Sequence, residues 1–252
     1  MSADLELAEW AARAAGEVLM TYYGREPEGL DSKTSVTDPV SDADREAERL
    51  IRELLTAERP DDGLVAEEGS HTEPTSGRTW IVDPLDGTVN FLYGLRTWAV
   101  SIALEDQDGL AVGVVFNPVD GECFSAQRGA GATLNGLPIR VNGCRALERA
   151  MVATGFSYEA ERRAEQASLL VELLPRIRDV RRAGAAALDL AYVAAGRVDA
   201  YYERGLQLWD EAAGRLLVTE AGGAVADLDG EPHGVVAAAT PELLEELLPL
   251  VA

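Results

Sequence analysis

Apolar residues recur at helical spacing over residues 4–23 and again from Ser41 to about residue 57. Ser41 is expected to cap the second of these helices, with Asp44 in the position of a capping-box acid. Shorter apolar runs follow, bounded by turn residues, and these favour strands. The expected strands are 64–66, a run ending at Asp83, 99–104, 110–116, 123–126 and 132–134. Asn135-Gly136 supplies a strong turn signal, so these last runs predict an antiparallel meander.

From Met151 onward the pattern changes to an alternation of strands and helices. The expected elements are strand 151–154, helix 159–174, strand 178–181, helix 185–195, strand 200–203 and a helix from Asp210 to Gly222 or Gly223. An α+β first half and an α/β second half are therefore predicted. We expect one domain over residues 1–252, with half-lobes of about 1–145 and 146–252.

The charge balance narrows the classes of partner. The chain has 44 Asp plus Glu against 22 Lys plus Arg, a net charge of -22. Nucleic acids and anionic membranes need a basic patch that this sequence lacks, so neither is an expected partner. The first helix carries acidic residues, unlike a signal peptide, and the two cysteines form no C-x-x-C pair. A reducing cytoplasm is the expected compartment.

Two carboxylates flank a proline within the stretch Trp80 to Phe91, W-I-V-D-P-L-D-G-T-V-N-F. Asp83 is expected to end a strand where Pro84 stops the ladder, and Asp83 and Asp86 can then share hard cations that prefer oxygen ligands. Gly87 permits a close backbone approach, and Thr88 can open a short helix whose N–H groups face an anion. Asp-Pro and Asp-Gly are also ordinary turn sequences, so the structural alternative stays open for this stretch alone.

A second stretch favours the functional interpretation. Residues 208–223 read L-W-D-E-A-A-G-R-L-L-V-T-E-A-G-G, so Asp210 lies near the start of an amphipathic helix. With these motifs, with Glu67-Glu68-Gly69 and with D-P-V-S-D-A-D at 38–44, the chain resembles the inositol monophosphatase family. The resemblance extends from Lys33 to Gly223, nearly the whole chain. It implies a five-layer αβαβα sandwich of the inositol monophosphatase and fructose-1,6-bisphosphatase type.

The resemblance also implies a magnesium-dependent, lithium-sensitive phosphatase of sugar or polyol monophosphates. Divalent cations would neutralise phosphate oxygens, lower the pKa of a bound water and stabilise the leaving alkoxide. Two to three Mg²⁺ ions are implied, with Mn²⁺ as a substitute and Li⁺ and Ca²⁺ as inhibitors. The implied ligands are Glu68, Asp83 and the Leu85 carbonyl for the first ion, and Asp83, Asp86 and Asp210 for the second. Glu67 is taken as a neighbour.

The implied catalytic residues are Thr88, Asp44 and Lys33. Water is the expected nucleophile, and the family pattern has the Thr88 hydroxyl relay a proton from metal-bound water to Asp44. Lys33 is the only lysine beside 21 arginines, which indicates either codon bias or a need for a compact ammonium. The family places a lysine there on a loop over the metals, and we expect Asp38 of this loop near a third cation. A plain surface lysine is the alternative.

Substrate contacts are implied at two places. Phosphate would bind the Gly87 and Thr88 amides, and sugar hydroxyls would contact Gly184, Ala185, Ala186, Glu203, Asp86 and Asp210. Ala185 departs from the Ser or Thr usual in the family, which puts strict inositol preference in doubt.

Several alternatives remain at this point. Val89-Asn90-Phe91 disfavours bisphosphonucleoside phosphatases, whereas fructose-1,6-bisphosphatase and histidinol-phosphatase share the metal core. A regulatory binding partner that uses the fold as a scaffold is the non-enzymatic alternative, disfavoured by the intact set of carboxylates. The resemblance further implies a homodimer.

Overall fold

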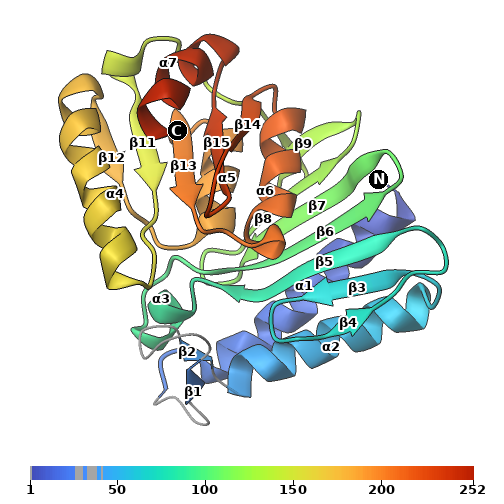
Figure 1. Cartoon of the computed structure of the whole chain (residues 1–252). Coiled ribbons are helices and arrows are strands. Elements are labelled where there is room, and N and C mark those ends of the chain that lie inside the picture. The colour runs from blue at the N-terminus through green and yellow to red at the C-terminus, as the bar shows by residue number, and fades with distance from the viewer. Residues whose placement is uncertain (1, 26–30, 33–38, 41) are drawn as a thin grey trace.

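The computed structural model describes residues 2–25, 31–32, 39–40 and 42–252, and it stacks helices and sheets in layers (Figure 1). Within the described residues the α-helices are α1 (Ala3–Tyr22), α2 (Asp42–Glu58), α3 (Thr88–Leu92), α4 (Ala160–Leu173), α5 (Ala186–Ala194), α6 (Leu208–Glu220) and α7 (Pro241–Val251). Two short 3-10 turns, η1 (Leu147–Arg149) and η2 (Leu174–Arg176), join elements of the second half.

The larger sheet has eight strands in the order β10-β9-β8-β7-β6-β5-β3-β4. Their bounds are β3 (Gly63–Ala66), β4 (His71–Thr72), β5 (Thr79–Asp86), β6 (Ala99–Asp106), β7 (Gly109–Asn117), β8 (Glu122–Gln127), β9 (Gly131–Leu134) and β10 (Leu137–Ile139). All of its pairs are antiparallel except β3 with β5, which is parallel. The predicted meander from residue 99 to the turn at Asn135-Gly136 is confirmed.

The second sheet has five strands in the order β12-β11-β13-β15-β14. They are β11 (Met151–Thr154), β12 (Asp179–Arg181), β13 (Ala200–Arg204), β14 (Ala224–Leu228) and β15 (Gly234–Ala238). β11 runs parallel to both β12 and β13, as the alternation of strands and helices predicts. A separate pair, β1 (Asp31–Ser32) and β2 (Pro39–Val40), forms a two-stranded sheet.

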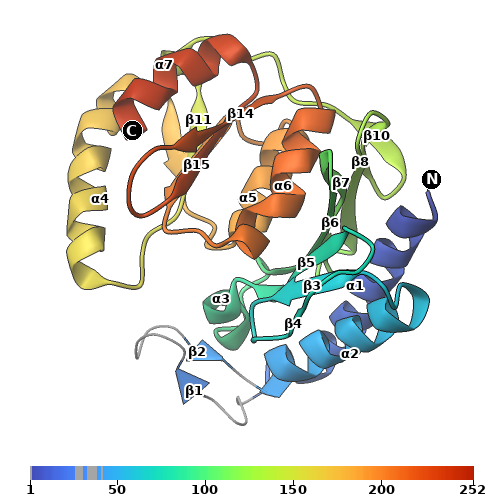
Figure 2. The ribbon, with the colours of Figure 1, turned by 45° about the vertical axis from the view of Figure 1, so that its right-hand side comes forward.

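Five layers result from the way the helices cover these sheets. α1 and α2 contact the outer face of the eight-stranded sheet, and α5 and α6 contact its inner face. The five-stranded sheet lies on the other side of α5 and α6, and α7 covers its far face beside α4 (Figure 2). The predicted αβαβα sandwich is therefore confirmed. The division into two half-lobes stays a prediction.

Three clusters of buried apolar side chains fill the spaces between these layers. One lies between α1, α2 and the large sheet, a second around α5 and α6, and a third beneath α4 and α7. Small residues make the middle layer thin. A Cβ on Gly113 of β7 would lie 2.8 Å from the carbonyl oxygen of Ala213, so glycine lets α6 approach the sheet closely. This approach brings the start of α6 to the end of β5.

The sequence pattern misplaced two boundaries and missed several elements. β5 continues past Asp83 to Asp86, whereas the pattern ends it at Asp83. The ladder survives because an irregularity falls between Asp83 and Asp86, and Pro84, which has no N–H, lies within it. α6 begins at Leu208, two residues before the predicted start at Asp210. Strands β14 and β15 and helix α7 lie beyond the region that the pattern covered.

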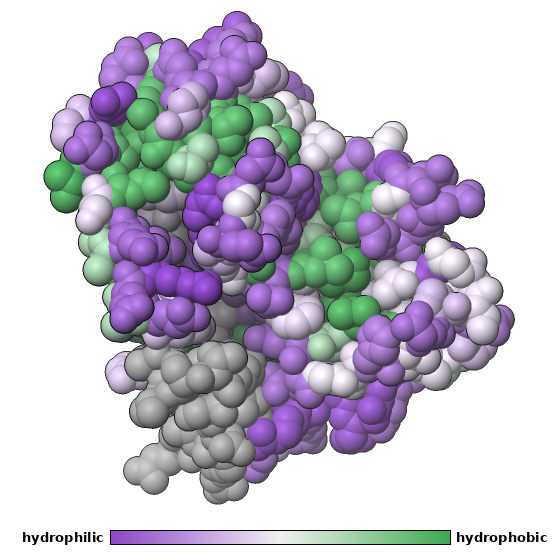
Figure 3. All heavy atoms as spheres, viewed as in Figure 1, coloured by the Kyte–Doolittle hydropathy of each residue, from purple (hydrophilic) through white to green (hydrophobic). Residues whose placement is uncertain are grey.

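On the face seen in Figure 3, hydrophilic side chains cover much of the described surface. Hydrophobic ones gather near the top, around α7, and in a smaller patch right of the centre. None of the described helices is both long and apolar enough to cross a membrane.

Candidate active site

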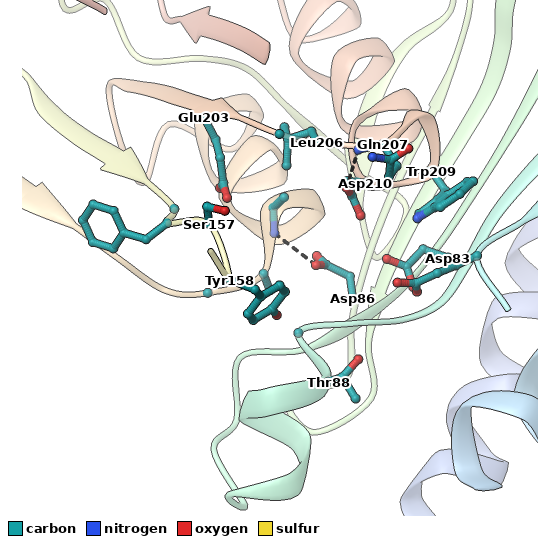
Figure 4. A pocket seen from close by; sticks show the side chains of 18 of the residues that line it. Asp83, Asp86, Thr88, Ser157, Tyr158, Glu203, Leu206, Gln207, Trp209 and Asp210 are labelled. Carbon is teal, nitrogen blue, oxygen red and sulfur yellow. Dashed lines mark hydrogen bonds between the residues drawn. The ribbon is translucent and has the colours of Figure 1, made fainter. Parts of the chain in front are cut away.

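A pocket of about 750 Å³ opens where the end of β5 faces the loops of the five-stranded sheet. It is lined by residues from segments 67–69, 83–88, 155–159, 182–186 and 203–210, together with Arg162. Segments far apart in the sequence thus meet here, and Asp83, Asp86 and Asp210 lie close together on one side of it (Figure 4). Glu203, Ser157 and Tyr158 lie on the opposite side.

The irregularity in β5 decides which way its two aspartates face. In a regular strand residues three apart point to opposite faces of the sheet. Here Asp83 pairs with Ser101 and Asp86 pairs with Ala99, so β5 contains one residue more than β6 over this interval. The extra residue lets Asp83 and Asp86 both line the pocket, although Asp83 is only 1% exposed and Asp86 only 7%.

Backbone amides hold both carboxylates in place. The Leu85 amide donates to Asp83 Oδ1 at 2.9 Å. The amides of Ala186 and Ala187, in the first turn of α5, donate to the two oxygens of Asp86 at 3.1 and 2.8 Å. A carboxylate at a helix N-terminus is favoured by the helix dipole. Asp86 therefore fastens the end of β5 to the middle layer of helices.

Asp210 reaches the same place from the first turn of α6. Its Oδ2 accepts a hydrogen bond of 2.6 Å from the Gln207 amide, and Gln207 and Asp210 form a capping box. The Ser101 hydroxyl, on the residue paired with Asp83, donates to the Trp209 carbonyl at 3.3 Å. These contacts fix the start of α6 against the large sheet, so the acid of the second motif lies beside those of the first.

The two adjacent glutamates after β3 differ in their surroundings. Glu67 lies close to Asp83, and its charge acts on Asp83, Asp86 and Asp210. Glu68 lines the pocket, and its backbone amide donates to the buried Glu48 at 2.6 Å. Glu68 is the ligand that the resemblance implies, with Glu67 as a neighbour. Both line the pocket, and the charge of Glu67 is the one that acts on all three aspartates there.

Burial and mutual repulsion raise the pKa values of these acids. Burial is the main cause of a rise in the pKa of Asp83 well above its ordinary value, and the charges of Glu67 and Asp86 add to it. The pKa of Asp86 rises to about 7, also mainly through burial, although the Ala187 amide opposes the rise. Burial likewise raises the pKa of Asp210. So many acids in one place are costly unless protons or cations compensate them.

Divalent cations fit this donor set by its chemistry. The side chains of Glu67, Asp83, Asp86 and Asp210 offer only oxygen, which Mg²⁺ prefers. In the part of the chain that the structure describes, no three His, Cys, Asp or Glu side chains are arranged to hold a metal ion as they stand. Ligation would require small rotations of these carboxylates.

Thr88 lines the pocket, and Asp44 lies behind it within reach of its hydroxyl. The Thr88 hydroxyl lies 3.4 Å from Asp44 Oδ1 and 3.1 Å from the Leu85 carbonyl oxygen, so it can donate to either. Asp44 lies on α2 and is fully buried. Gly87, with φ of 86°, turns the chain into α3. Lys33 and Asp38 lie outside the described residues.

The opposite wall is built from small residues and one acid. Gly184, with φ of 87°, precedes Ala185 and the start of α5, and Ala185 is only 2% exposed. The Ala186 amide is already engaged with Asp86, so it positions that acid. Glu203, at the end of β13, lines the pocket and accepts a hydrogen bond of 2.7 Å from the Tyr201 hydroxyl. Burial raises the pKa of Glu203 to about 7.

The sequence pattern predicted no supporting role for two further residues, Asn90 and Glu48. Asn90 Nδ2 donates to the carbonyls of Thr97 and Ala183 at 2.6 and 2.8 Å, and so joins α3 to the loop before α5. Glu48 accepts from the amides of Glu68 and Ser70 and holds the turn after β3. Their partners are distant in the sequence, so periodicity could not have shown these roles.

Comparisons with known proteins identify the family of this chain. The model of the inositol monophosphatase family matches residues 2–252. Such a match defines the class as phosphoric monoester hydrolases. The chain belongs to the inositol monophosphatase family.

Individual relatives cover nearly the whole chain. It is 45% identical to an inositol-1-monophosphatase of Rhizobium meliloti over 233 residues. This match covers 91% of this chain and 87% of that protein. It is 40% identical over 254 residues to a protein of Pasteurella multocida named Nus factor SuhB, covering 98% and 95% of the two chains.

Solved structures give the same result. The extragenic suppressor protein suhB of Bartonella henselae superposes with a TM-score of 0.92 at 40% identity, covering 99% of this chain and 98% of that one. An IMPase of Thermotoga maritima gives a TM-score of 0.90 at 33% identity, with coverage of 99% and 97%.

Proposed function

We propose that this phosphatase hydrolyses a sugar or polyol monophosphate, such as myo-inositol monophosphate, with Mg²⁺ as its cofactor. The observation that carries the proposal is the set of four acids, Glu67, Asp83, Asp86 and Asp210, gathered beside the Thr88–Asp44 pair. We assign Glu67 the place first given to Glu68, because the charge of Glu67 acts on Asp83, Asp86 and Asp210. The Leu85 carbonyl lies at the same end of β5 and supplies a further oxygen.

Bound cations would neutralise phosphate oxygens, acidify a water and stabilise the leaving alkoxide. The chain itself contributes orientation and proton transfer. The Thr88 hydroxyl can pass a proton to Asp44, which lies within reach and away from solvent. Water then adds to phosphorus as the bond to the alcohol oxygen breaks, and the products are the alcohol and inorganic phosphate. The amides of Gly87 and Thr88 lie where the phosphate would bind.

Substrate choice depends on the opposite wall. Glu203 can accept hydrogen bonds from hydroxyls, as a polyol requires, and the backbone at Gly184 and Ala185 borders the same space. Ala185 supplies no hydroxyl there, which supports a substrate range that is broader than inositol phosphates. Fructose 1,6-bisphosphate and histidinol phosphate therefore remain candidates.

The test is phosphate release from a panel of phosphate esters with Mg²⁺, with Mn²⁺ and with EDTA. We expect release from at least one polyol or sugar monophosphate with Mg²⁺ and none with EDTA. Turnover that persists in EDTA would contradict the role of the metal. Li⁺ and Ca²⁺ added to the same assay test the expected inhibition.

A regulatory role is the second candidate, and the Pasteurella multocida relative's name, Nus factor SuhB, is what favours it. Such a role would rest on surfaces outside the pocket. A variant with Asp83 replaced by Asn should then lose turnover and keep its partners, which separates the two functions.

A further inference from the structure

The ends of two parallel strands, β11 and β13, lie side by side at the edge of the pocket. Their register pairs Val152 with Ala200 and Thr154 with Tyr202. The next step along both strands brings Gly155 beside Glu203. Neighbouring side chains in a sheet stand on the same face and compete for the same space. The residue at position 155 therefore affects the space available to the Glu203 side chain.

Gly155 leaves room that the Glu203 carboxyl group fills. A Cβ added to Gly155 would come well inside van der Waals contact with the carboxyl carbon and both oxygens of Glu203. The backbone does not require glycine here, because Gly155 is not among the glycines with positive φ, unlike Gly87 and Gly184. What matters at this position is the missing side chain.

The other side of the same carboxyl group is fixed by Tyr201. The Tyr201 hydroxyl donates to Glu203 Oε2 at 2.7 Å, and the Tyr201 ring is fully buried in the central core. The positive charge of Arg182 also attracts Glu203. Glu203 therefore points into the pocket on the side opposite the aspartates, as Figure 4 shows.

We propose that Gly155 is a specificity-determining position, which lets Glu203 keep the orientation set by Tyr201 and accept hydrogen bonds from substrate hydroxyls. The inference rests on the proposed function and deepens it. Its substrate class is phosphate monoesters with free hydroxyls near the ester, as opposed to esters without them. A site built to accept hydroxyl hydrogen bonds discriminates strongly against substrates that lack them.

The Gly155→Ala variant tests this inference with two substrates, myo-inositol 1-phosphate and phenyl phosphate, at saturating Mg²⁺. The atoms that would clash are at the far end of a flexible side chain, so the variant should fold with the carboxylate displaced. We expect kcat/KM to fall by about 10–100-fold for the inositol phosphate, the worth of a hydrogen bond to a charged group. The fall for phenyl phosphate should be several-fold smaller.

Gly143→Ala is the matched control, because a Cβ at Gly143 meets nothing within 4 Å and φ there is not positive. This control variant should leave kcat/KM unchanged for both substrates. A second arm repeats Gly155→Ala in a Glu203→Ala background. There the added methyl group has no carboxylate to displace, so the two changes should be strongly non-additive.

Equal losses of kcat/KM on the two substrates would overturn the inference. So would an equal effect of Gly155→Ala in the wild-type and Glu203→Ala backgrounds. A crystal structure of the Gly155→Ala variant that keeps the Tyr201–Glu203 hydrogen bond would overturn it too. Failure of the proposed function would be seen separately, as wild-type protein that releases phosphate from neither substrate.

Discussion

The wall of the pocket that comes from the eight-stranded sheet differs from the wall that comes from the five-stranded sheet. On the first, Asp83 and Asp86 are nearly inaccessible and are fastened by backbone amides. On the second, Gly155 leaves room that one acid, Glu203, fills, and the Tyr201 hydroxyl holds its carboxylate. A rigid group of several carboxylates suits the chemical step, which all phosphate esters share. A single hydrogen-bond acceptor that faces the pocket suits discrimination between the alcohol parts of different substrates.

This comparison predicts that changes to the first wall reduce turnover of every substrate. Asp83→Asn should cause the largest loss, about 10⁴-fold in kcat, because several kcal/mol of transition-state stabilisation depend on the charge it contributes. The measurement is kcat on a polyol phosphate and on phenyl phosphate over a Mg²⁺ titration. Near-normal turnover of this variant at high Mg²⁺ would contradict the proposed role of Asp83 as a metal ligand.

Thr88→Ala should lower kcat by roughly 10²–10³-fold, within the usual range for positioned proton transfer. Thr88→Ser keeps the hydroxyl within reach of Asp44 and should recover most of the activity. Both substrates should respond alike, since the step is shared. A loss seen only as a higher Mg²⁺ requirement would mean that the hydroxyl helps to bind metal and does not transfer a proton.

The adjacent glutamates, Glu67 and Glu68, provide a matched pair of variants that tests which of them binds the metal. Glu67→Gln should raise the Mg²⁺ concentration needed for half-maximal activity by about 10–100-fold, the range reported for groups that support a metal site. Glu68→Gln should raise it far less, because the charge of Glu67 is the one that acts on Asp83, Asp86 and Asp210. The reverse order of effects would restore Glu68 as the ligand.

The last prediction concerns stability and pH in the metal-free protein. The pKa of Asp86 is about 7 in the fold against an ordinary 3.8, and that of Glu203 is about 7 against 4.5. Between these values the folded protein retains protons that the unfolded chain has released. The free energy of unfolding should therefore fall as pH rises toward about 7, by up to about 1.4 kcal/mol per pH unit for each group.

Urea unfolding in EDTA at pH 5 and pH 7.5 measures this fall. Asp86→Asn should make it shallower, and Mg²⁺ should restore stability at the higher pH. The acids paired with arginine, Asp106, Asp179 and Asp227, have pKa values below their ordinary value, so they lose their contribution only at more acidic pH. A metal-free protein that gains stability from pH 5 to 7.5 would contradict the assigned shifts.

Local pattern was sufficient for much of this molecule. Periodicity predicted helices and strands such as α1, the meander and the strand–helix alternation, because those signals depend on neighbours within a few residues. The motifs around Asp83 and Asp210 likewise predicted two groups of acids. Ser41, expected to cap the second helix, lies outside the described residues, while α2 itself runs over Asp42–Glu58.

Tertiary structure alone decided which acids face each other. Asp83 and Asp86 share one side only because the ladder with β6 gains an extra residue, and a sequence does not state its own register. Glu67 and Glu68 are adjacent in the turn after β3 and both line the pocket, so their roles depend on how contacts such as the Glu48 hydrogen bonds hold that turn. Gly155 and Glu203 meet only through the parallel pairing of β11 and β13. Such contacts are set by long-range packing, which the composition of any short segment leaves open.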